Sequence, residues 1–324
     1  MIVVLVELAG GHPEPSSLET LTLGRRLAEE SGTTLEAVTV GPGAGAAVGE
    51  LAAYGVSTVH VVEHERLDDY APDAWAASLV QLIEARPPTV VLATGSDRGN
   101  EVMAHVAARI GAAMAANCTE VRPGDPFLVT RQRWGGSLLE EARLEGPVKL
   151  LTISPHALAA EESAAVRACG VEQFTPALSD AEFRVRVVGH LPPEPGKVSL
   201  ADARVVVGGG RGVGSAEGFA ELEELAGLLG GAVGVSRVVT SAGWRPHAEQ
   251  VGQTGQRIAP DLYIACGISG AIQHMVGCKS AKRILAINTD AEAPIVTKAT
   301  YAVIGDLHAI VPALSAEIRR ATGR

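Results

Sequence analysis

Short apolar runs alternate with helix-like segments along the chain, and this alternation stops once and then restarts. The first series contains strand-like runs at 2–8, Leu35–Val40 and Thr58–Val62, with helical patterns over 17–31 and 72–84. Parallel strands need a crossover connection, which is usually a helix. The pattern therefore predicts mostly parallel sheets with helices on both faces, and 324 residues suffice for two such domains.

A proline-rich stretch at 191–197 separates the two series. It reads Leu-Pro-Pro-Glu-Pro-Gly-Lys, and prolines spaced so closely favour a stiff, extended connector. We predict an N-terminal α/β domain over 1–190, a linker over 191–199 and a second domain over 200–324.

The end of the first domain departs from the alternation. Strand-like runs at Phe127–Arg133, 137–144 and 148–154 follow one another with links too short for helices. We interpret these runs as antiparallel strands added to the first sheet, and we predict its last strand at 183–188.

The second domain restarts the alternation of strands and helices. The expected strands are 204–207, Ala232–Val235, Leu262–Cys266, 283–287 and 302–305. Helices are expected over 215–229, with Ser215 as the N-cap, from 271 onward, and over 311–320. This order predicts a doubly wound, Rossmann-like sheet.

Charge and composition exclude several classes of protein. A formal net charge of -10 and an aromatic content of 3% disfavour binding to nucleic acid. No apolar run approaches the length of a membrane span and no signal-peptide pattern opens the chain, so we expect no membrane insertion and a cytoplasmic location in a prokaryote. The 4 cysteines form no Cys-x-x-Cys pair, so we expect free thiols and no metal site.

Polar or glycine-rich residues follow each of the predicted strands of the second domain. They are Arg211, Ser236 with Arg237, Ser269 with Gly270, Asn288 and Asp306. Ligands of open parallel sheets bind beyond the carboxyl ends of the strands. We therefore predict a nucleotide-sized ligand at this rim.

The glycine-rich loop at 208–214 has two interpretations. It does not match the GxGxxG fingerprint, because Val213 stands where the third glycine is needed. Its backbone N–H groups and Arg211 can hold a diphosphate. The alternative is a tight turn with a solvated arginine.

Two further segments carry candidate ligand contacts. Gly270 permits the close approach of a ligand, Ser269 can cap a helix, and His274 lies in the field of that helix N-terminus; a purely structural histidine is the alternative. The segment 251–255 offers Thr254 and backbone amides to a heterocycle, or it is a β-turn. We find no nucleophile motif and predict no catalytic residue.

Several sequence segments occur in a characteristic order after residue 208. They are GGRG (209–212), VGVSR (233–237), QVGQTG (250–255), APDLYIACGISGAIQH (259–274), AIN (286–288) and EAPI (292–295). Together they resemble the FAD domain of the electron-transfer flavoprotein alpha subunit over about residues 200–315. The first domain is similar to this family only in architecture and at RQRWGG (131–136).

The resemblance implies one FAD in the second domain, within a heterodimer whose beta subunit carries AMP or a second FAD. The first domain would form the subunit interface. The implied FAD contacts are Arg211, Ser236, Arg237, Val251, Gly252, Gln253, Thr254, Ser269, Gly270, Ala271, Ile272, Gln273, His274, Asn288, Asp306 and Leu307.

Three of these residues would surround the isoalloxazine ring. The resemblance implies that Arg237 lies beside the ring, Thr254 near N5 and His274 near the O2 carbonyl. A guanidinium and an imidazole donor favour the negative charge that reduction places on the ring, as a one-electron carrier needs.

The chain departs from the usual family pattern at a few positions. Ser241 stands where an acid is common, His247-Ala248 replaces a common Asn-Asp, and Thr289 replaces a common lysine. None of these residues is an implied FAD contact, so the departures concern the partners more than the cofactor.

The resemblance implies an electron carrier rather than an enzyme. It would take electrons from flavoprotein dehydrogenases, such as the acyl-CoA dehydrogenases of fatty-acid β-oxidation, and pass them to a quinone oxidoreductase of the respiratory chain. An alternative is the alpha subunit of a flavin-based bifurcating complex that uses NADH. Other classes are an NAD-dependent oxidoreductase, which the missing GxGxxG disfavours, and a nucleotide sensor, which would purify colourless.

Overall fold

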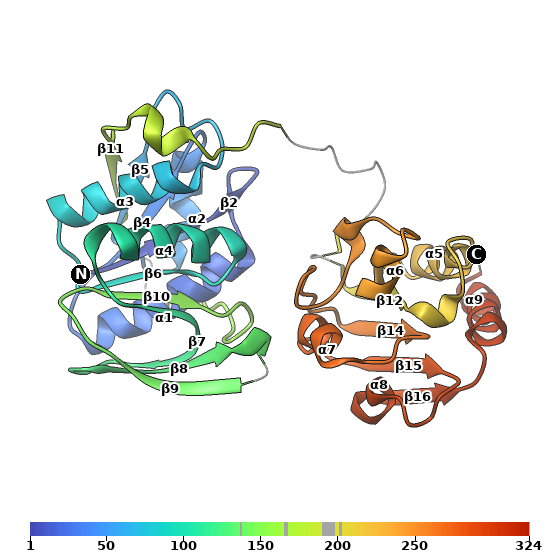
Figure 1. The fold of residues 1–324 in the computed structure, drawn as a ribbon. Coiled ribbons are helices and arrows are strands. Elements are labelled where there is room, and N and C mark those ends of the chain that lie inside the picture. The colour runs from blue at the N-terminus through green and yellow to red at the C-terminus, as the bar shows by residue number, and fades with distance from the viewer. Residues whose placement is uncertain (137, 165–167, 190–197, 201–202, 324) are drawn as a thin grey trace. The chain divides into compact units, whose positions relative to one another are not determined.

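The computed structural model describes residues 1–136, 138–164, 168–189, 198–200 and 203–323. The chain folds into two compact units, Met1–Leu191 and Pro192–Arg324, each built around its own sheet (Figure 1). Most of the predicted linker at 191–199 lies outside the described residues, so its bounds stay a prediction.

The first unit contains a sheet with the strand order β11-β5-β4-β1-β6-β10-β7-β8-β9. Neighbouring strands are parallel, except that β8 runs antiparallel to β7 and β9, so the predicted mostly parallel sheet with antiparallel additions is confirmed. The strands are β1 (Ile2–Leu5), β4 (Leu35–Val40), β5 (Thr58–Val62), β6 (Val90–Thr94), β7 (Met114–Arg122), β8 (Phe127–Arg133), β9 (Leu138–Leu144), β10 (Lys149–Ile153) and β11 (Gly170–Phe174). A separate hairpin is formed by β2 (Leu8–Ala9) and β3 (His12–Pro13).

Helices cover both faces of this sheet (Figure 1). One face carries α1 (Pro15–Glu30) and α2 (Val48–Ala53), and the other carries α3 (Pro72–Ala85) and α4 (Asp97–Ile110). Successive strand residues point to opposite faces. In β1, Val4 belongs to the core under α1, whereas Val3 belongs to the core under α3 and α4.

Two strand predictions for the first unit are wrong. The run at 148–154 is β10, which lies inside the sheet and is parallel to both β6 and β7. The chain bends at Asn117, whose φ is 56°; β7 pairs with β10 from Met114 to Cys118 and with β8 from Cys118 onward. Phe183 ends a 3-10 helix, Asp180–Phe183, and the edge strand is instead β11, whose largely exposed residues give no apolar pattern.

The second unit contains a fully parallel sheet with the order β13-β12-β14-β15-β16. Its strands are β12 (Val205–Gly209), β13 (Ala232–Val235), β14 (Leu262–Cys266), β15 (Ile284–Asn288) and β16 (Tyr301–Ile304). The order reverses between β12 and β14. A reversal of this kind is a topological switch point, where open α/β sheets leave a crevice for ligands.

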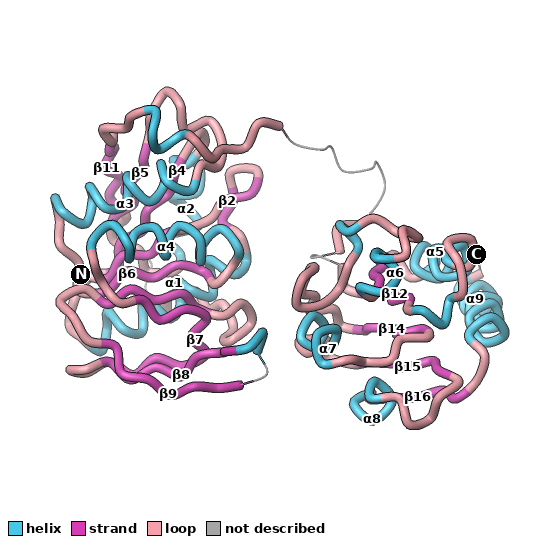
Figure 2. The backbone as a smooth tube through the Cα atoms, viewed as in Figure 1, coloured by secondary structure: helices cyan, strands magenta, loops and turns pink. Residues whose placement is uncertain are grey.

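Helices also cover both faces of the second sheet, which confirms the doubly wound prediction (Figure 2). One face packs against α5 (Phe219–Leu228), α6 (Arg237–Ser241) and α9 (Leu307–Thr322), and the other packs against α7 (Ile272–Cys278) and α8 (Pro294–Lys298). Across the described part of the chain, no helix combines the length and apolarity needed to cross a bilayer.

Three helix starts differ from the prediction. The helix expected from Ser215 begins at Phe219, and the Ser215 hydroxyl accepts a hydrogen bond from the Gly218 backbone at 3.4 Å within the preceding turn. The residue before α7 is Ala271, so Ser269 is not its cap. The last helix begins earlier than predicted, because the carboxylate of Asp306 accepts a hydrogen bond from the His308 backbone and caps it.

Candidate functional site

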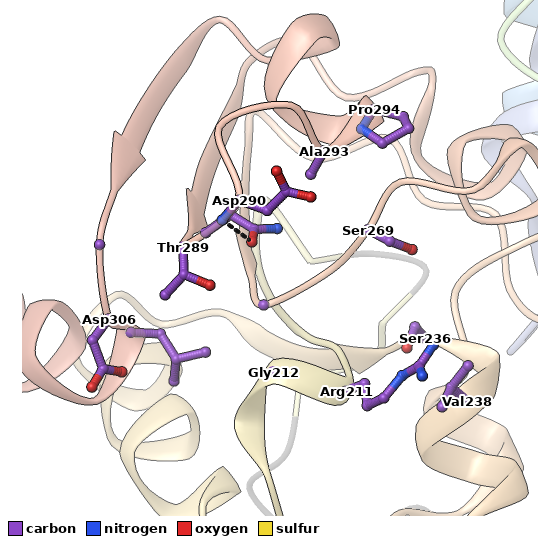
Figure 3. Close-up of a pocket in the computed structure, with 14 residues that line it drawn as sticks. Arg211, Gly212, Ser236, Val238, Ser269, Thr289, Asp290, Ala293, Pro294 and Asp306 are labelled. Atoms are coloured by element: carbon purple, nitrogen blue, oxygen red, sulfur yellow. Dashed lines mark hydrogen bonds between the residues drawn. The ribbon is translucent and has the colours of Figure 1, made fainter.

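Loops at the carboxyl ends of the second sheet enclose a cavity of about 380 Å³, which we name cavity A (Figure 3). It lies at the switch point between β12 and β14 and extends past β15 and β16. The predicted site residues that line it are Arg211, Ser236, Ser269, Asn288, Asp306 and Leu307. Figure 3 shows Arg211, Ser236 and Val238 close together, across the cavity from Thr289 and Asp290.

A second cavity of about 450 Å³, cavity B, adjoins the first. The two share Ser236, Val238 and Ser269. The remaining predicted site residues that line cavity B are Arg237, Val251, Gly252, Gln253, Thr254, Ala271, Gln273 and His274. The two cavities together offer room for an elongated ligand with two chemically different ends.

The glycine-rich loop after β12 is held against the loop after β14. The backbone N–H of Gly210 donates to the Cys266 carbonyl at 2.9 Å, and that of Gly212 donates to the Gly267 carbonyl at 3.0 Å. A Cβ atom on Gly210 would lie 2.3 Å from the Gly267 oxygen. These glycines therefore allow two backbones to meet, and of this loop Arg211 and Gly212 line cavity A.

Asn288 has a similar joining role. Its side-chain amide donates to the Ile268 carbonyl at 2.9 Å, and its oxygen accepts from the Asp290 backbone at 3.0 Å. Because both ends of the amide are occupied, Asn288 shapes cavity A by fixing the loops after β14 and β15.

His274 is a buried histidine with one free ring nitrogen. Nε2 lies 2.8 Å from the hydroxyl of Tyr263, and Nδ1 is buried without a hydrogen-bond partner among the described residues. Burial lowers the pKa of His274 to about 4, although the nearby Val251 carbonyl acts in the opposite direction. The imidazole is therefore neutral at pH 7. Because α7 has only 7 residues, its dipole makes no large contribution to the pKa of His274.

The protonated nitrogen of this imidazole follows from its neighbours. A tyrosine hydroxyl must donate its hydrogen when it is fully buried, and Tyr263 is 0% exposed. If the hydroxyl donates to Nε2, the ring hydrogen sits on Nδ1. His274 then presents an N–H donor beside cavity B.

The segment after Gln250 forms another wall of cavity B. The backbone N–H of Gln253 donates to the Gln273 carbonyl at 2.8 Å, which ties this segment to α7. The buried amide of Gln250 donates to the hydroxyl of Thr254 at 2.9 Å. Gly252 has a φ of 146°, a conformation that favours glycine, so the segment is more than the simple β-turn of the alternative interpretation.

The two cavities differ in charge. Arg211 lines cavity A and Arg237 lines cavity B, and both are exposed. No described carboxylate forms an ion pair with either guanidinium. Cavity A also contains the carboxylates of Asp290 and Asp306. A ligand that complements these charges carries an anionic group beside Arg211 and hydroxyl groups beside the two carboxylates. Its heterocycle would lie in cavity B.

All predicted contact residues except two line one of the cavities. Gly270 has a φ of 80°, and a Cβ atom there would lie 2.4 Å from the Ile295 backbone nitrogen. Its close approach is therefore to α8. Ile272 is 62% exposed and lines neither cavity.

The prediction omitted several residues of the site. Gln250 and Ser241 line cavity B, Thr289 and Asp290 line cavity A, and Tyr263 lies behind His274. Gln250 and Tyr263 stand inside the segments on which the family resemblance rests. Tyr263 stands between Leu262 and Ile264, so a hydroxyl within an apolar strand was the available signal for this residue.

Comparisons with known proteins agree with the division into two units. The model of the electron transfer flavoprotein domain matches residues 2–179. The model of the electron transfer flavoprotein FAD-binding domain matches residues 199–279, which contain Arg211, Arg237 and His274.

Curated relatives match nearly the whole chain. The electron transfer flavoprotein subunit alpha of Mycobacterium tuberculosis is 38% identical over 99% of both chains. That of Thermoanaerobacterium thermosaccharolyticum is 33% identical over 98% of both chains. Protein FixB of Clostridium saccharobutylicum is 36% identical over 98% of this chain and 95% of its own length.

Proposed function

The chain belongs to the electron transfer flavoprotein family as an alpha subunit, and from this premise we propose that one FAD occupies cavities A and B. The observation that carries the proposal is the unpaired, buried Nδ1 of His274 beside cavity B. When bound, FAD supplies the redox chemistry, because its isoalloxazine ring takes up and releases electrons.

Cavity B suits the isoalloxazine ring. The Nδ1–H of His274 has no partner among the described residues and can donate to a ring carbonyl. Thr254 offers a hydroxyl to another ring atom, and Arg237 adds a fixed positive charge. Because His274 stays neutral, Arg237 is the group that compensates negative charge on the reduced ring.

Cavity A suits the diphosphate and ribose of the same cofactor. Arg211 can pair with a diphosphate, as guanidinium groups do. Asp290 and Asp306 repel phosphate but accept hydrogen bonds from ribose hydroxyl groups. This arrangement orients the cofactor, with its ring toward cavity B.

In this role the chain carries electrons within a heterodimer with a beta subunit. The donors would be flavoprotein dehydrogenases, with acyl-CoA dehydrogenases as the first class to test, and the acceptor a quinone oxidoreductase. The beta subunit would contribute an AMP site. These partners are inferred from family membership, which the relatives named as alpha subunits support.

The test is to purify the chain with the beta subunit encoded beside it and to measure the flavin and AMP released per heterodimer. One FAD, one AMP and no NADH oxidation support the simple carrier. Two FADs with NADH oxidation indicate the bifurcating form instead. A colourless complex contradicts FAD binding and favours a nucleotide sensor or an NAD-dependent enzyme.

A further inference from the structure

Three polar side chains form a line behind cavity B. The hydroxyl of Thr240 lies 2.7 Å from Oε1 of Gln250, and Nε2 of Gln250 lies 2.9 Å from the hydroxyl of Thr254. Thr254 and Gln250 line cavity B, whereas Thr240 stands behind them on α6. Gln250 is only 2% exposed, so both ends of its amide need partners within the protein.

Thr240 has a choice of acceptors. Its hydroxyl lies 3.0 Å from the Arg237 carbonyl as well as 2.7 Å from Gln250. A hydroxyl carries one hydrogen and therefore donates one strong hydrogen bond at a time. The line consequently has two complete hydrogen-bond patterns.

In the first pattern, Thr240 donates to Oε1 of Gln250 and Nε2 donates to Thr254. The Thr254 oxygen is then an acceptor within the line, and its own hydrogen is free to point into cavity B. Thr254 thus presents a donor to a ligand.

In the second pattern, Thr240 donates to the Arg237 carbonyl. The Gln250 amide is turned over, so that its NH2 donates to Thr240 and its oxygen accepts from Thr254. Thr254 then presents only oxygen lone pairs to a ligand. The change needs two hydroxyl rotations and one amide reversal, and no proton passes between residues.

Burial couples the two hydroxyl rotations and the amide reversal, so that they occur together. If Gln250 turned over while Thr240 kept its orientation, two donors or two acceptors would face each other inside the protein. An unpaired buried polar group is costly, so the intermediate arrangements are disfavoured. The line therefore alternates between two states as a unit.

We propose that Gln250 is a positioning residue that lets Thr254 switch between hydrogen-bond donor and acceptor as the bound flavin changes its oxidation state. This inference rests on the proposed function. N5 of the oxidised ring is an acceptor; two electrons and one proton, which the reductant and the solvent supply, convert it to an N–H donor. The first pattern matches the oxidised ring and the second matches the reduced ring.

The test uses the complex with its beta subunit, loaded with 15N-labelled FAD, and follows the N5 resonance. In Gln250→Glu, measured at alkaline pH so that the buried side chain is ionised, the carboxylate accepts from both threonines and holds Thr254 in the second pattern. We expect the oxidised N5 to lose its hydrogen bond and to resonate as it does in Thr254→Val. After reduction by dithionite, Gln250→Glu should keep the wild-type N5–H signal, whereas Thr254→Val should not.

A matched control separates the switch from the added charge. Gln256 lines neither cavity, and its backbone N–H donates to the Gln250 carbonyl at 2.7 Å, so Gln256→Glu adds the same charge nearby but outside the line. It should leave the oxidised N5 hydrogen bond in place. If Gln256→Glu reproduces Gln250→Glu, the effect is one of charge and the proposal is overturned.

A measurement on the unaltered complex requires no variant to fold. With 15N-labelled glutamine, the side-chain NH2 of Gln250 should lie near the Thr254 methyl group in the oxidised state and near the Thr240 methyl group after reduction. If the Gln250 NH2 keeps the same contacts in the oxidised and the reduced complex, the proposal is overturned. The proposed function then still stands, because the complex contains FAD. A complex without flavin overturns the proposed function itself.

Discussion

The two sheets differ at their switch points. Between β1 and β6 of the first sheet, side chains form hydrogen bonds with one another. At the switch point of the second sheet, between β12 and β14, side chains line two cavities. The Ser96 hydroxyl donates to the Glu7 carboxylate at 2.5 Å. Beside them, Thr152 donates to Asn100 at 2.7 Å, and Asn100 donates to Asn117 at 3.1 Å. A ligand at this point would have to break bonds that already exist.

At the second switch point, several polar side chains that line the cavities are not bonded to one another. Nδ1 of His274 has no partner among the described residues, and Arg211 and Arg237 form no ion pair with a described carboxylate. Unpaired groups gain more from a ligand than paired ones do. A shared sheet topology therefore determines where a crevice forms, while the local side chains determine whether a ligand fills it.

The largest expected effect comes from the backbone contact beneath cavity A. Gly210→Ala places a Cβ atom 2.3 Å from the Gly267 oxygen, which forces the two loops apart. We expect the free energy of unfolding of the second unit to fall by about 3 kcal/mol and flavin to be lost. Thermal unfolding and the flavin absorbance measure both.

The control for this change is Gly227→Ala. Gly227 lies in α5, and a Cβ atom there meets nothing within 4 Å. This substitution should stabilise the helix by about 1 kcal/mol. Equal stability of the two variants would show that the loop contact is not as tight as described.

One buried group in each unit, His274 in the second and Glu7 in the first, should respond to acid in opposite directions. His274 has a usual pKa of 6.5, lowered to about 4 in the folded chain. The unfolded chain therefore binds more protons between these values, and the second unit loses about 3 kcal/mol as the pH falls from 6.5 to 4. Burial raises the pKa of Glu7, so protonation of this side chain contributes stability to the first unit as the pH falls, whereas Glu182, whose pKa is lowered by its hydrogen bonds from Ser179, contributes in the opposite direction.

Hydrogen exchange at several pH values measures each unit separately. Backbone amides of β14 should lose protection on acidification relative to those of β1. In His274→Gln this extra loss should disappear. Its persistence in that variant would assign the acid sensitivity to another group.

A smaller effect is expected from opening the first switch point. Asn100→Ala leaves the hydroxyl of Thr152 and the amide of Asn117 without their partner. We expect a loss of about 1–3 kcal/mol in the stability of the first unit with unchanged flavin content. Flavin loss at unchanged stability of the second unit would mean that the first switch point also contributes to binding.

The smallest expected effect concerns charge alone. Arg237 is exposed, so Arg237→Ala should leave the fold intact and make ring reduction about 1–2 kcal/mol less favourable. Arg237→Lys keeps the charge and should retain most of the potential. A potentiometric titration that gives one potential for all three proteins would remove Arg237 from this role.

Much of the second unit follows from its sequence. Strand-like runs ended by Arg211, Asn288 and Asp306 marked the carboxyl rim, and all three residues line cavity A. The first unit was less predictable. The interior position of β10 depends on the bend at Asn117, and the exposed residues of β11 carry no apolar period, so long-range pairing decided both.

The hydrogen bonds behind the site could not be predicted from the sequence pattern either. The sequence marks Thr254 and His274 as candidate contacts, but their hydrogen-bonding states depend on Gln250 and Tyr263, which approach only in the folded chain. Gly270 shows the reverse error. The demand for glycine there arises from the α8 backbone at Ile295 rather than from a ligand.

The most direct test of FAD binding in cavities A and B is a crystal structure of the complex with its beta subunit, grown with FAD bound. We predict electron density for one FAD in this chain, with the ring in cavity B beside His274 and the diphosphate in cavity A beside Arg211. Flavin density at the crevice between β1 and β6, with cavities A and B holding only water, would contradict the account.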